Sequence, residues 1–130
     1  MIVSGNAVAM PWVDEVPAIV QSWYNGTESG NALASILSGE VNPSGKLPMT
    51  FPVKLEDNGA HALGEFPGND ISGNINQKYN EDIFVGYRWI DKKEIKPLFA
   101  FGHGLSYTTF EYGNASISKN QKRYYIHYQR

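Results

Sequence analysis

The segment 42–52, with the sequence NPSGKLPMTFP, constrains the fold more than any other part of this chain. It starts with a Pro-Ser-Gly turn, in which Pro43 fixes φ and Gly45 can adopt a positive φ. The two later prolines bias the residues before them towards extended geometry, which predicts a strand over 46–51. Because proline donates no backbone hydrogen bond, this strand should lie at the edge of a sheet or end early.

A β-α-β unit is predicted around this segment. The apolar run 18–24 is short and rich in β-branched and aromatic residues, which favours a buried strand. Apolar residues at helical spacing predict a helix over 28–38, with Thr27 as its N-cap and Gly39 as its C-terminal stop. A helix between two strands normally joins them in parallel through a right-handed crossover.

Less regular structure is predicted elsewhere. Residues 11–16 can form one helical turn between two prolines. Residues 53–78 are rich in Gly and Asn and poor in large apolar residues, so we expect a long mobile loop. Residues 83–90 alternate with period two and predict a strand, although a helical stripe of apolar residues is the alternative. Residues 110–118 predict another strand, and the tail from 119 is either a further strand or frayed.

Composition excludes several classes of function. The 130 residues suffice for one domain, and 42% hydrophobic and 18% charged residues are typical of a globular one. The net charge of −2 argues against nucleic acid or an anionic membrane as a partner, since both need a concentrated basic patch. The absence of cysteine excludes a disulfide framework and thiolate metal sites. No apolar run approaches the ~20 residues that span a bilayer.

Three blocks of sequence resemble one protein family in the same order. They are MPWVDEVPAIVQSWYNGTESGNALASILSGEVNPSGKLPMTFP at 10–52, YNEDIFVGYRWID at 79–91 and PLFAFGHGLSYTTFEY at 97–112. With SGNAV at 4–8, these blocks cover most of the first 112 residues. They are similar to the C-terminal α/β domain of glycoside hydrolase family 3, which contains β-glucosidases and β-xylosidases.

The resemblance implies an α/β fold. The chain would form a partial α/β sandwich with a small mixed, mostly parallel sheet, one well-defined helix, a long mobile loop and a β-rich C-terminal end. Residues 1–112 would be the later half of the sandwich domain, and 113–130 the linker to a following fibronectin-type β domain or its start. The family places this region far from its own N-terminus, so we expect Met1 to lie inside a longer protein. The sheet would then lack its first strands and expose an edge.

The resemblance also implies a function. The parent would be a retaining, exo-acting β-glycosidase that releases glucose or a similar sugar from β-linked oligosaccharides or glycosides, without a metal or organic cofactor. Such hydrolysis needs two carboxyl groups about 5 Å apart. In the family, the nucleophilic Asp lies in a barrel domain that precedes this region, and the acid/base Glu lies upstream of the segment that resembles 4–8. We therefore expect no catalytic residue here, an inactive isolated chain, and the barrel domain of the same protein as its partner.

Some carboxylates of this chain remain candidates for other roles. Asp14, Glu15 and Glu28 are predicted to be solvated or to lie at helix starts, where acidic side chains are favourable. Glu81 and Asp82 precede the predicted strand 83–90 and lie beside the long loop, so they are our candidates for substrate binding. A turn or an ion pair is the alternative for both.

Histidine and aromatic residues indicate packing more than chemistry. His61, His103 and His127 lack metal-ligand spacing, so no metal site is expected. The glycines that flank His103 indicate a tightly packed backbone. Trp23 and Trp89 lie in predicted strands, where aromatic side chains pack a core, whereas Trp12 is open to core packing or sugar stacking.

Two alternatives to an enzyme fragment stay open. A non-catalytic carbohydrate-binding module would bind saccharides through exposed aromatic residues without hydrolysis, and a structural or interaction domain would do neither. The resemblance leaves the cellular location open as well, because family members occur in periplasmic, secreted and cytoplasmic settings. We favour a periplasmic or secreted location.

Overall fold

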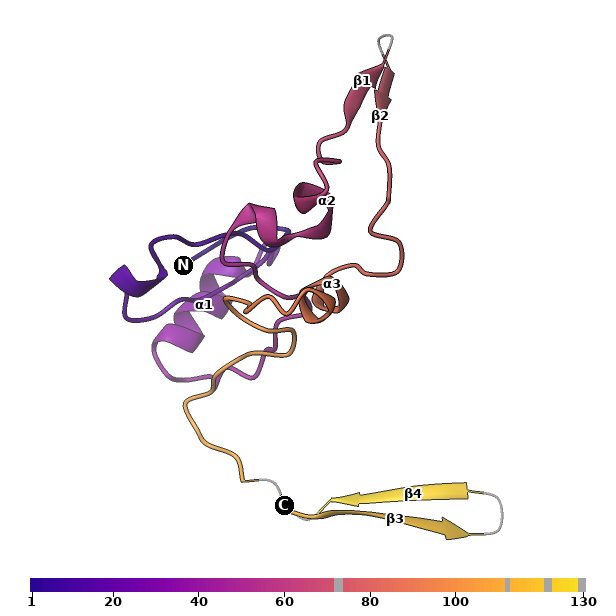
Figure 1. Cartoon of the computed structure of the whole chain (residues 1–130). Coiled ribbons are helices and arrows are strands. Elements are labelled where there is room, and N and C mark those ends of the chain that lie inside the picture. The colour runs from indigo at the N-terminus through magenta and orange to yellow at the C-terminus, as the bar shows by residue number, and fades with distance from the viewer. Residues whose placement is uncertain (72–73, 112, 121–122, 129–130) are drawn as a thin grey trace.

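The computed structural model describes residues 1–71, 74–111, 113–120 and 123–128. Figure 1 shows a body that contains α1, α2 and α3, the β1–β2 hairpin projecting from it, and the β3–β4 hairpin standing apart. The helical elements are η1 (Val13–Glu15), α1 (Ser29–Leu37), η2 (Leu55–Asp57), α2 (Gly59–Ala62) and α3 (Tyr87–Lys92). The strands are β1 (Asn69–Ile71), β2 (Asn74–Asn76), β3 (Ala115–Asn120) and β4 (Arg123–Tyr128). Within the described ranges, no helix is long and apolar enough to cross a membrane.

Both sheets of the described residues are antiparallel pairs, β1 with β2 and β3 with β4. The only parallel pairing recorded among these residues is an isolated bridge between Ile2 and Gln21. The presence of both helices and strands agrees with the expected α/β class, but the predicted small, mostly parallel sheet is absent from the described part of the chain.

The predicted helix 28–38 is confirmed as α1. Gly39 follows it with a φ of 83°, and its backbone N–H donates to the Ile36 carbonyl at 3.1 Å, as expected of a C-terminal stop. The N-cap prediction was wrong by one residue, because Glu28 rather than Thr27 occupies that position, and it makes no side-chain capping bond.

The first predicted strand of the β-α-β unit, 18–24, is present only as a short extended segment that pairs with Ile2. The Ile2 N–H donates to the Val20 carbonyl at 2.8 Å, and the Ser22 N–H donates to the Ile2 carbonyl at 2.9 Å. Trp23 then has a φ of 55°, which a strand cannot contain, so the pairing ends there.

The second predicted strand, 46–51, contacts the segment 98–103. The Leu47 N–H donates to the His103 carbonyl at 2.8 Å, and the Phe51 N–H donates to the Phe99 carbonyl at 2.8 Å. Among the described residues, the one β-bridge that 46–51 forms is antiparallel and joins Phe51 to Phe99. The prolines of this segment explain why no longer ladder forms. The two predicted strands therefore approach each other through side chains, with Trp23 edge-on to Phe51 at a ring distance of 6.1 Å.

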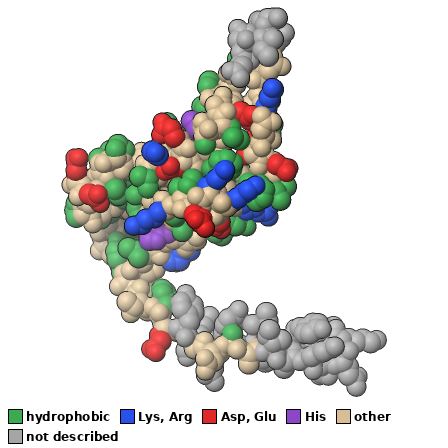
Figure 2. Space-filling model, viewed as in Figure 1, with side chains coloured by type: hydrophobic (Ala, Val, Ile, Leu, Met, Phe, Trp, Pro, Cys, Tyr) green, Lys and Arg blue, Asp and Glu red, His purple; other side chains and the backbone are tan. Residues whose placement is uncertain are grey.

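The buried apolar side chains recorded among the described residues are Met10, Phe51, Pro52, Trp89 and Ile90. Phe51 occupies the centre, edge-on to Trp23 and also to Phe99, whose ring lies 6.4 Å away. Many other large apolar side chains stay exposed, and Figure 2 shows them interspersed with charged side chains over the visible face.

The region 53–78 is not the structureless loop that we predicted. It contains η2, α2 and the β1–β2 hairpin. Its glycines explain the difference, since Gly64 and Gly68 have φ values of 69° and 104° and support tight turns between short elements. Mobility of this region stays a prediction.

The strand predicted over 83–90 was also wrong, and the helical alternative holds for its second half. Gly86 has a φ of 60° and interrupts the extended run, after which α3 begins at Tyr87. Trp89 and Ile90 are the buried residues of this helix, which continues through Asp91 to Lys92.

The prediction of strands at the C-terminal end is confirmed, but the first of them begins and ends later in the sequence than predicted. The strand predicted over 110–118 appears as β3, and the tail forms β4 opposite it, with Ile117 paired to Ile126. The predicted single helical turn over 11–16 is present as η1.

Candidate functional site

The larger of two pockets found among the described residues has a volume of about 450 Å³ and lies where five segments meet. This volume falls within the range of about 300–1,000 Å³ that is typical of small-molecule sites. Phe66, Phe84, Tyr87 and Phe101 contribute aromatic rings to its lining, and Glu81 is the one carboxylate among the lining residues. These are Asn6, Ala7, Pro48, Met49, Thr50, Asn58, Gly59, Ala60, His61, Phe66, Glu81, Phe84, Val85, Gly86, Tyr87 and Phe101.

Glu81 lines this pocket with most of its side chain buried. Its exposed fraction is 9%, and its Oε2 atom has no hydrogen-bond partner among the described residues. Gly59 allows this burial, because a Cβ there would lie 3.3 Å from the Glu81 Cβ and 3.2 Å from Cδ2 of Trp89. A buried carboxylate oxygen without a donor is costly, and this sets Glu81 apart from the other lining side chains of the pocket.

Asp82 does not join Glu81 in the pocket. It is exposed, has a φ of 56°, and donates its backbone N–H to the Tyr79 carbonyl at 3.2 Å. The turn that carries both residues therefore buries the Glu81 side chain and leaves the Asp82 side chain exposed. The structure brings Glu81 to the larger pocket and leaves Asp82 outside the lining residues.

A buried carboxylate that the sequence did not reveal holds the turn in place. Glu65 has an exposed fraction of 7%, and its Oε2 accepts the Asn80 backbone N–H at 3.0 Å. Its Oε1 also accepts a hydrogen bond from the Asn80 side-chain amide. Glu65 thus ties together the two ends of the segment that carries the β1–β2 hairpin, immediately before Glu81. Fifteen residues separate the two partners, so no local pattern could indicate this contact.

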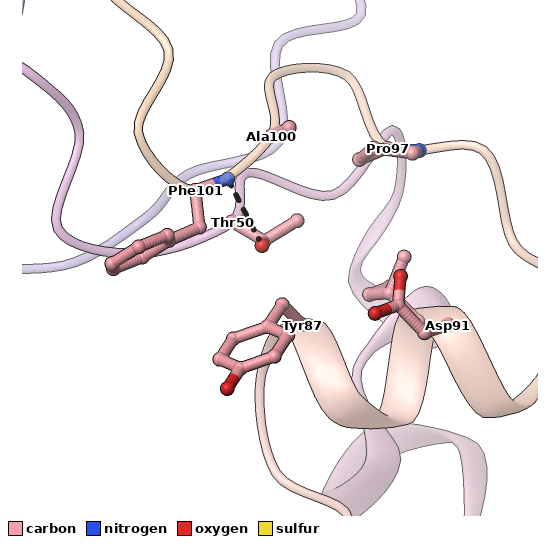
Figure 3. A pocket seen from close by; sticks show the side chains of 7 residues that line it. Thr50, Tyr87, Asp91, Pro97, Ala100 and Phe101 are labelled. Carbon is pink, nitrogen blue, oxygen red and sulfur yellow. Dashed lines mark hydrogen bonds between the residues drawn. The ribbon is translucent and has the colours of Figure 1, made fainter. Parts of the chain in front are cut away.

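A smaller pocket of about 220 Å³ adjoins the larger one (Figure 3). Thr50, Tyr87 and Phe101 line both pockets. Asp91 is the one carboxylate that lines the smaller pocket, and it comes from α3. The predicted strand over 83–90 did not indicate this position, because Tyr87 and Asp91 share a face only when the segment is helical.

The other candidate acids lie outside both pockets. Asp14 and Glu15 are exposed in η1, and Glu28 accepts a hydrogen bond from the Asn31 side-chain amide at 2.6 Å at the start of α1. These positions agree with the solvated and helix-start roles predicted for them.

The described histidines contact aromatic rings. His61 lies 4.7 Å from the Phe66 ring, and His103 stacks on Phe99 at 5.1 Å. His127 lies in β4, and its side chain is outside the described residues. In the part of the chain that the structure describes, no three His, Cys, Asp or Glu side chains gather as a metal ion would require.

One of the three tryptophans takes its predicted core position. Trp89 is buried, whereas Trp23 is half-buried and packs edge-on to Phe51. Trp12 has an exposed fraction of 38% and lines neither pocket, so neither core packing nor a place in the candidate site is supported for it.

Residues 1–107 match the family model described as the glycosyl hydrolase family 3 C-terminal domain. The chain is 62% identical over 120 residues to a beta-glucosidase of Bacteroides ovatus, covering 91% of this chain and 16% of that relative. It is 50% identical over 127 residues to beta-glucosidase B of Emericella nidulans, covering 92% of this chain and 15% of the relative. The chain therefore spans about one sixth of the length of these relatives.

Solved structures show the same similarity. Beta-glucosidase 3B from Thermotoga neapolitana in complex with glucose superposes with a TM-score of 0.82 at 40% identity, over 96% of this chain and 17% of that one. The beta-glucosidase from Kluyveromyces marxianus in complex with glucose superposes with a TM-score of 0.75 at 45% identity, over 89% of this chain and 14% of that one.

Proposed function

The chain belongs to the glycosyl hydrolase family 3 C-terminal domain family, and on that premise we propose that it is part of a retaining, exo-acting β-glycosidase. The observation that carries this proposal is the 62% identity to a beta-glucosidase, because it extends over 91% of the chain rather than over one short motif. The proposed substrates are β-linked oligosaccharides or glycosides with glucose or a similar sugar at the non-reducing end.

The isolated chain is inactive in this proposal. Retaining hydrolysis needs two carboxyl groups on either side of one glycosidic bond, about 5 Å apart. Glu81 is alone among carboxylates in the larger pocket, and Asp91 is alone in the smaller one. Neither pocket of the described residues therefore offers the pair, and the catalytic carboxylates belong to other parts of the parent, including its barrel domain.

Completion by the rest of the parent also accounts for the exposed apolar surface. Phe66, Val85 and Phe101 line the larger pocket, yet their exposed fractions are 54%, 62% and 58%. In the parent, the barrel domain covers part of this surface, and upstream strands complete the small, mostly parallel sheet of the partial sandwich. Residues 1–112 then form the later half of that sandwich, and 113–130 lead into or begin a following β domain. The family match over 1–107 supports this division.

The turn at Glu81 and Asp82 is the proposed contribution of this chain to substrate binding. Glu81 has an unpartnered carboxylate oxygen in a pocket rich in aromatic side chains, a combination that suits a sugar with its hydroxyl groups and apolar ring faces. Asp82 is exposed beside this pocket and would contact the substrate at its rim.

Hydrolysis of an aryl β-glucoside tests the proposed function. We expect no turnover by the 130-residue chain and clear turnover by the protein expressed from its complete reading frame, because only the latter would carry both catalytic carboxylates. Turnover by the isolated chain would contradict the proposal that the catalytic carboxylates lie in other parts of the parent protein. Saccharide binding without hydrolysis by the longer protein would instead favour a non-catalytic carbohydrate-binding domain.

In the longer protein, Glu81→Gln is expected to raise KM for the aryl β-glucoside about tenfold, since it weakens a hydrogen bond to a charged group. Asp82→Asn should raise KM by about two- to threefold, because water screens an exposed carboxylate. Glu56→Gln is the matched control, since Glu56 is exposed and lines neither pocket. If Glu81→Gln and Glu56→Gln have the same kinetics, Glu81 does not bind the substrate.

A further inference from the structure

We propose that Asn25 is a site of spontaneous chemical modification, at which the side-chain amide is converted to a carboxylate through a cyclic imide. The chain contains two Asn-Gly pairs, Asn25-Gly26 and Asn58-Gly59. Glycine at the second position favours this reaction in both pairs, since no side chain shields the attacking backbone nitrogen. The structure exposes the first pair and packs the second, and this difference assigns the reaction to Asn25. The inference does not depend on the proposed function.

The reaction needs only water as a co-reactant. The backbone nitrogen of Gly26 attacks Cγ of Asn25, so that an N–Cγ bond forms and the Cγ–Nδ2 bond breaks. Nδ2 leaves as ammonia and takes the proton of the Gly26 amide with it. Water then opens the imide at Cγ to give aspartate, or at the backbone carbonyl carbon of Asn25 to give isoaspartate. A neutral side chain becomes a carboxylate, and the formal net charge falls by one from its value of −2.

The Asn25-Gly26 pair can reach the geometry of ring closure. Both residues are exposed, and a Cβ at Gly26 would meet nothing within 4 Å. In the described part of the chain, the peptide group that joins them takes part in no backbone hydrogen bond, so its rotation towards the Asn25 side chain breaks none. The side-chain amide donates to Oγ of Ser22 at 3.1 Å, an exposed bond that water can replace.

The Asn58-Gly59 pair is held in place at the start of α2. The Asn58 carbonyl accepts the Ala62 backbone N–H at 2.8 Å. Gly59 is half-buried, and a Cβ there would lie 3.2 Å from Cδ2 of Trp89 and 3.3 Å from Cβ of Glu81. Rotation of the peptide group between Asn58 and Gly59 would break this hydrogen bond and disturb this packing. The fold therefore protects Asn58.

The protected pair is the one in the candidate site. Asn58 and Gly59 line the larger pocket, where conversion of Asn58 would add a second carboxylate to that of Glu81. Asn25 lines neither pocket. The modification is therefore directed away from the candidate site, to the turn that precedes α1.

Peptide mapping of the protein expressed from its complete reading frame, after incubation at mildly alkaline pH, tests the assignment. Trypsin places the two pairs in separate peptides, because Lys46 and Lys54 lie between them. We expect the peptide with Asn25 to gain the mass of an amide-to-acid conversion about tenfold faster than the peptide with Asn58, since a backbone hydrogen bond of ordinary strength must first break at Asn58. The product should separate into aspartate and isoaspartate forms. Equal rates for the two peptides, or aspartate alone, would overturn the proposal.

Two controls separate the effect of the fold from the effect of local sequence. In guanidinium chloride both pairs lose their packing, and we expect their rates to converge. An equally large difference in the unfolded protein would show that neighbouring residues protect Asn58, and would overturn the assignment. Asn25→Gln should remove the isoaspartate form from its peptide, because glutamine would have to close a larger ring. An unchanged amount of isoaspartate in this variant would place the reaction at another residue.

Discussion

Replacing Phe51 with alanine is expected to lower the free energy of unfolding by about 3–5 kcal/mol, the range measured for buried aromatic residues. Phe51 has an exposed fraction of 1% and packs edge-on against Trp23 and Phe99. It also joins 46–51 to 98–103 through its backbone. The substitution leaves a cavity where these segments meet, and few other apolar side chains of the described residues are buried deeply enough to close it.

Urea unfolding followed by tryptophan fluorescence measures this effect, since Trp23 lies directly against the substituted ring. Phe110→Ala is the matched control, because Phe110 has an exposed fraction of 64% and should change stability by less than about 0.5 kcal/mol. A loss below about 1 kcal/mol for Phe51→Ala would show that the packing around Phe51 does not stabilise the chain.

Gly104→Ala is expected to lower the free energy of unfolding by about 2–3 kcal/mol, the upper part of the usual cost of overpacking. A Cβ at this position would overlap the Gly45 carbonyl oxygen and lie 2.9 Å from Cδ of Lys46. The backbone cannot move aside freely, because the Leu47 N–H donates to the His103 carbonyl at 2.8 Å.

The same substitution would loosen the seam between 42–46 and 104–108. There the Ser106 hydroxyl donates to the Pro43 carbonyl at 2.6 Å, and the Tyr107 N–H donates to Oδ1 of Asn42 at 2.8 Å. Amide hydrogen exchange should therefore accelerate at Tyr107 in Gly104→Ala, along with the loss measured in urea. Gly45→Ala is the matched control, since its Cβ would meet nothing within 4 Å. Equal stability of the two variants would contradict the predicted overlap.

Elements with strong local signals were predictable from the sequence. The helix α1 combines apolar residues at helical spacing with Gly39, and both signals lie within the helix itself or next to it. The prolines of 42–52 indicated an extended segment with little pairing, and the structure shows a single bridge at Phe51. The glycines around His103 indicated a tightly packed backbone, and Gly104 indeed lies against Gly45.

Where the sequence pattern fitted more than one type of secondary structure, the conformation of a single residue decided which one formed. The alternation over 83–90 resembles a strand, but Gly86 at a φ of 60° redirects the chain and lets Trp89 and Ile90 enter the core from a helix. Trp23 at a φ of 55° similarly ends the first predicted strand. A positive φ at tryptophan is unfavourable in isolation, so tertiary contacts such as that with Phe51 decide it.

The candidate site was predictable only in part. Glu81 was a candidate because it lies beside the predicted long loop, and the structure places it in the larger pocket, whereas Asp82 stays outside. Glu65 and Asp91 had no sequence signal for their positions. Glu65 acts through a contact with Asn80 across the β1–β2 hairpin, and Asp91 faces its pocket only because α3 is helical.

The sequence by itself determined family membership, the α1 helix and the sites where proline and glycine restrict the backbone, because each of these is written in local residue types and their order. The tertiary structure alone decided the antiparallel contact of 46–51 with 98–103, the burial of Glu65 and Glu81, and the wall that Thr50, Tyr87 and Phe101 share between two pockets. These features join residues that are 15 to 56 positions apart. Their free energy comes from packing and hydrogen bonds that form only when the whole chain is folded.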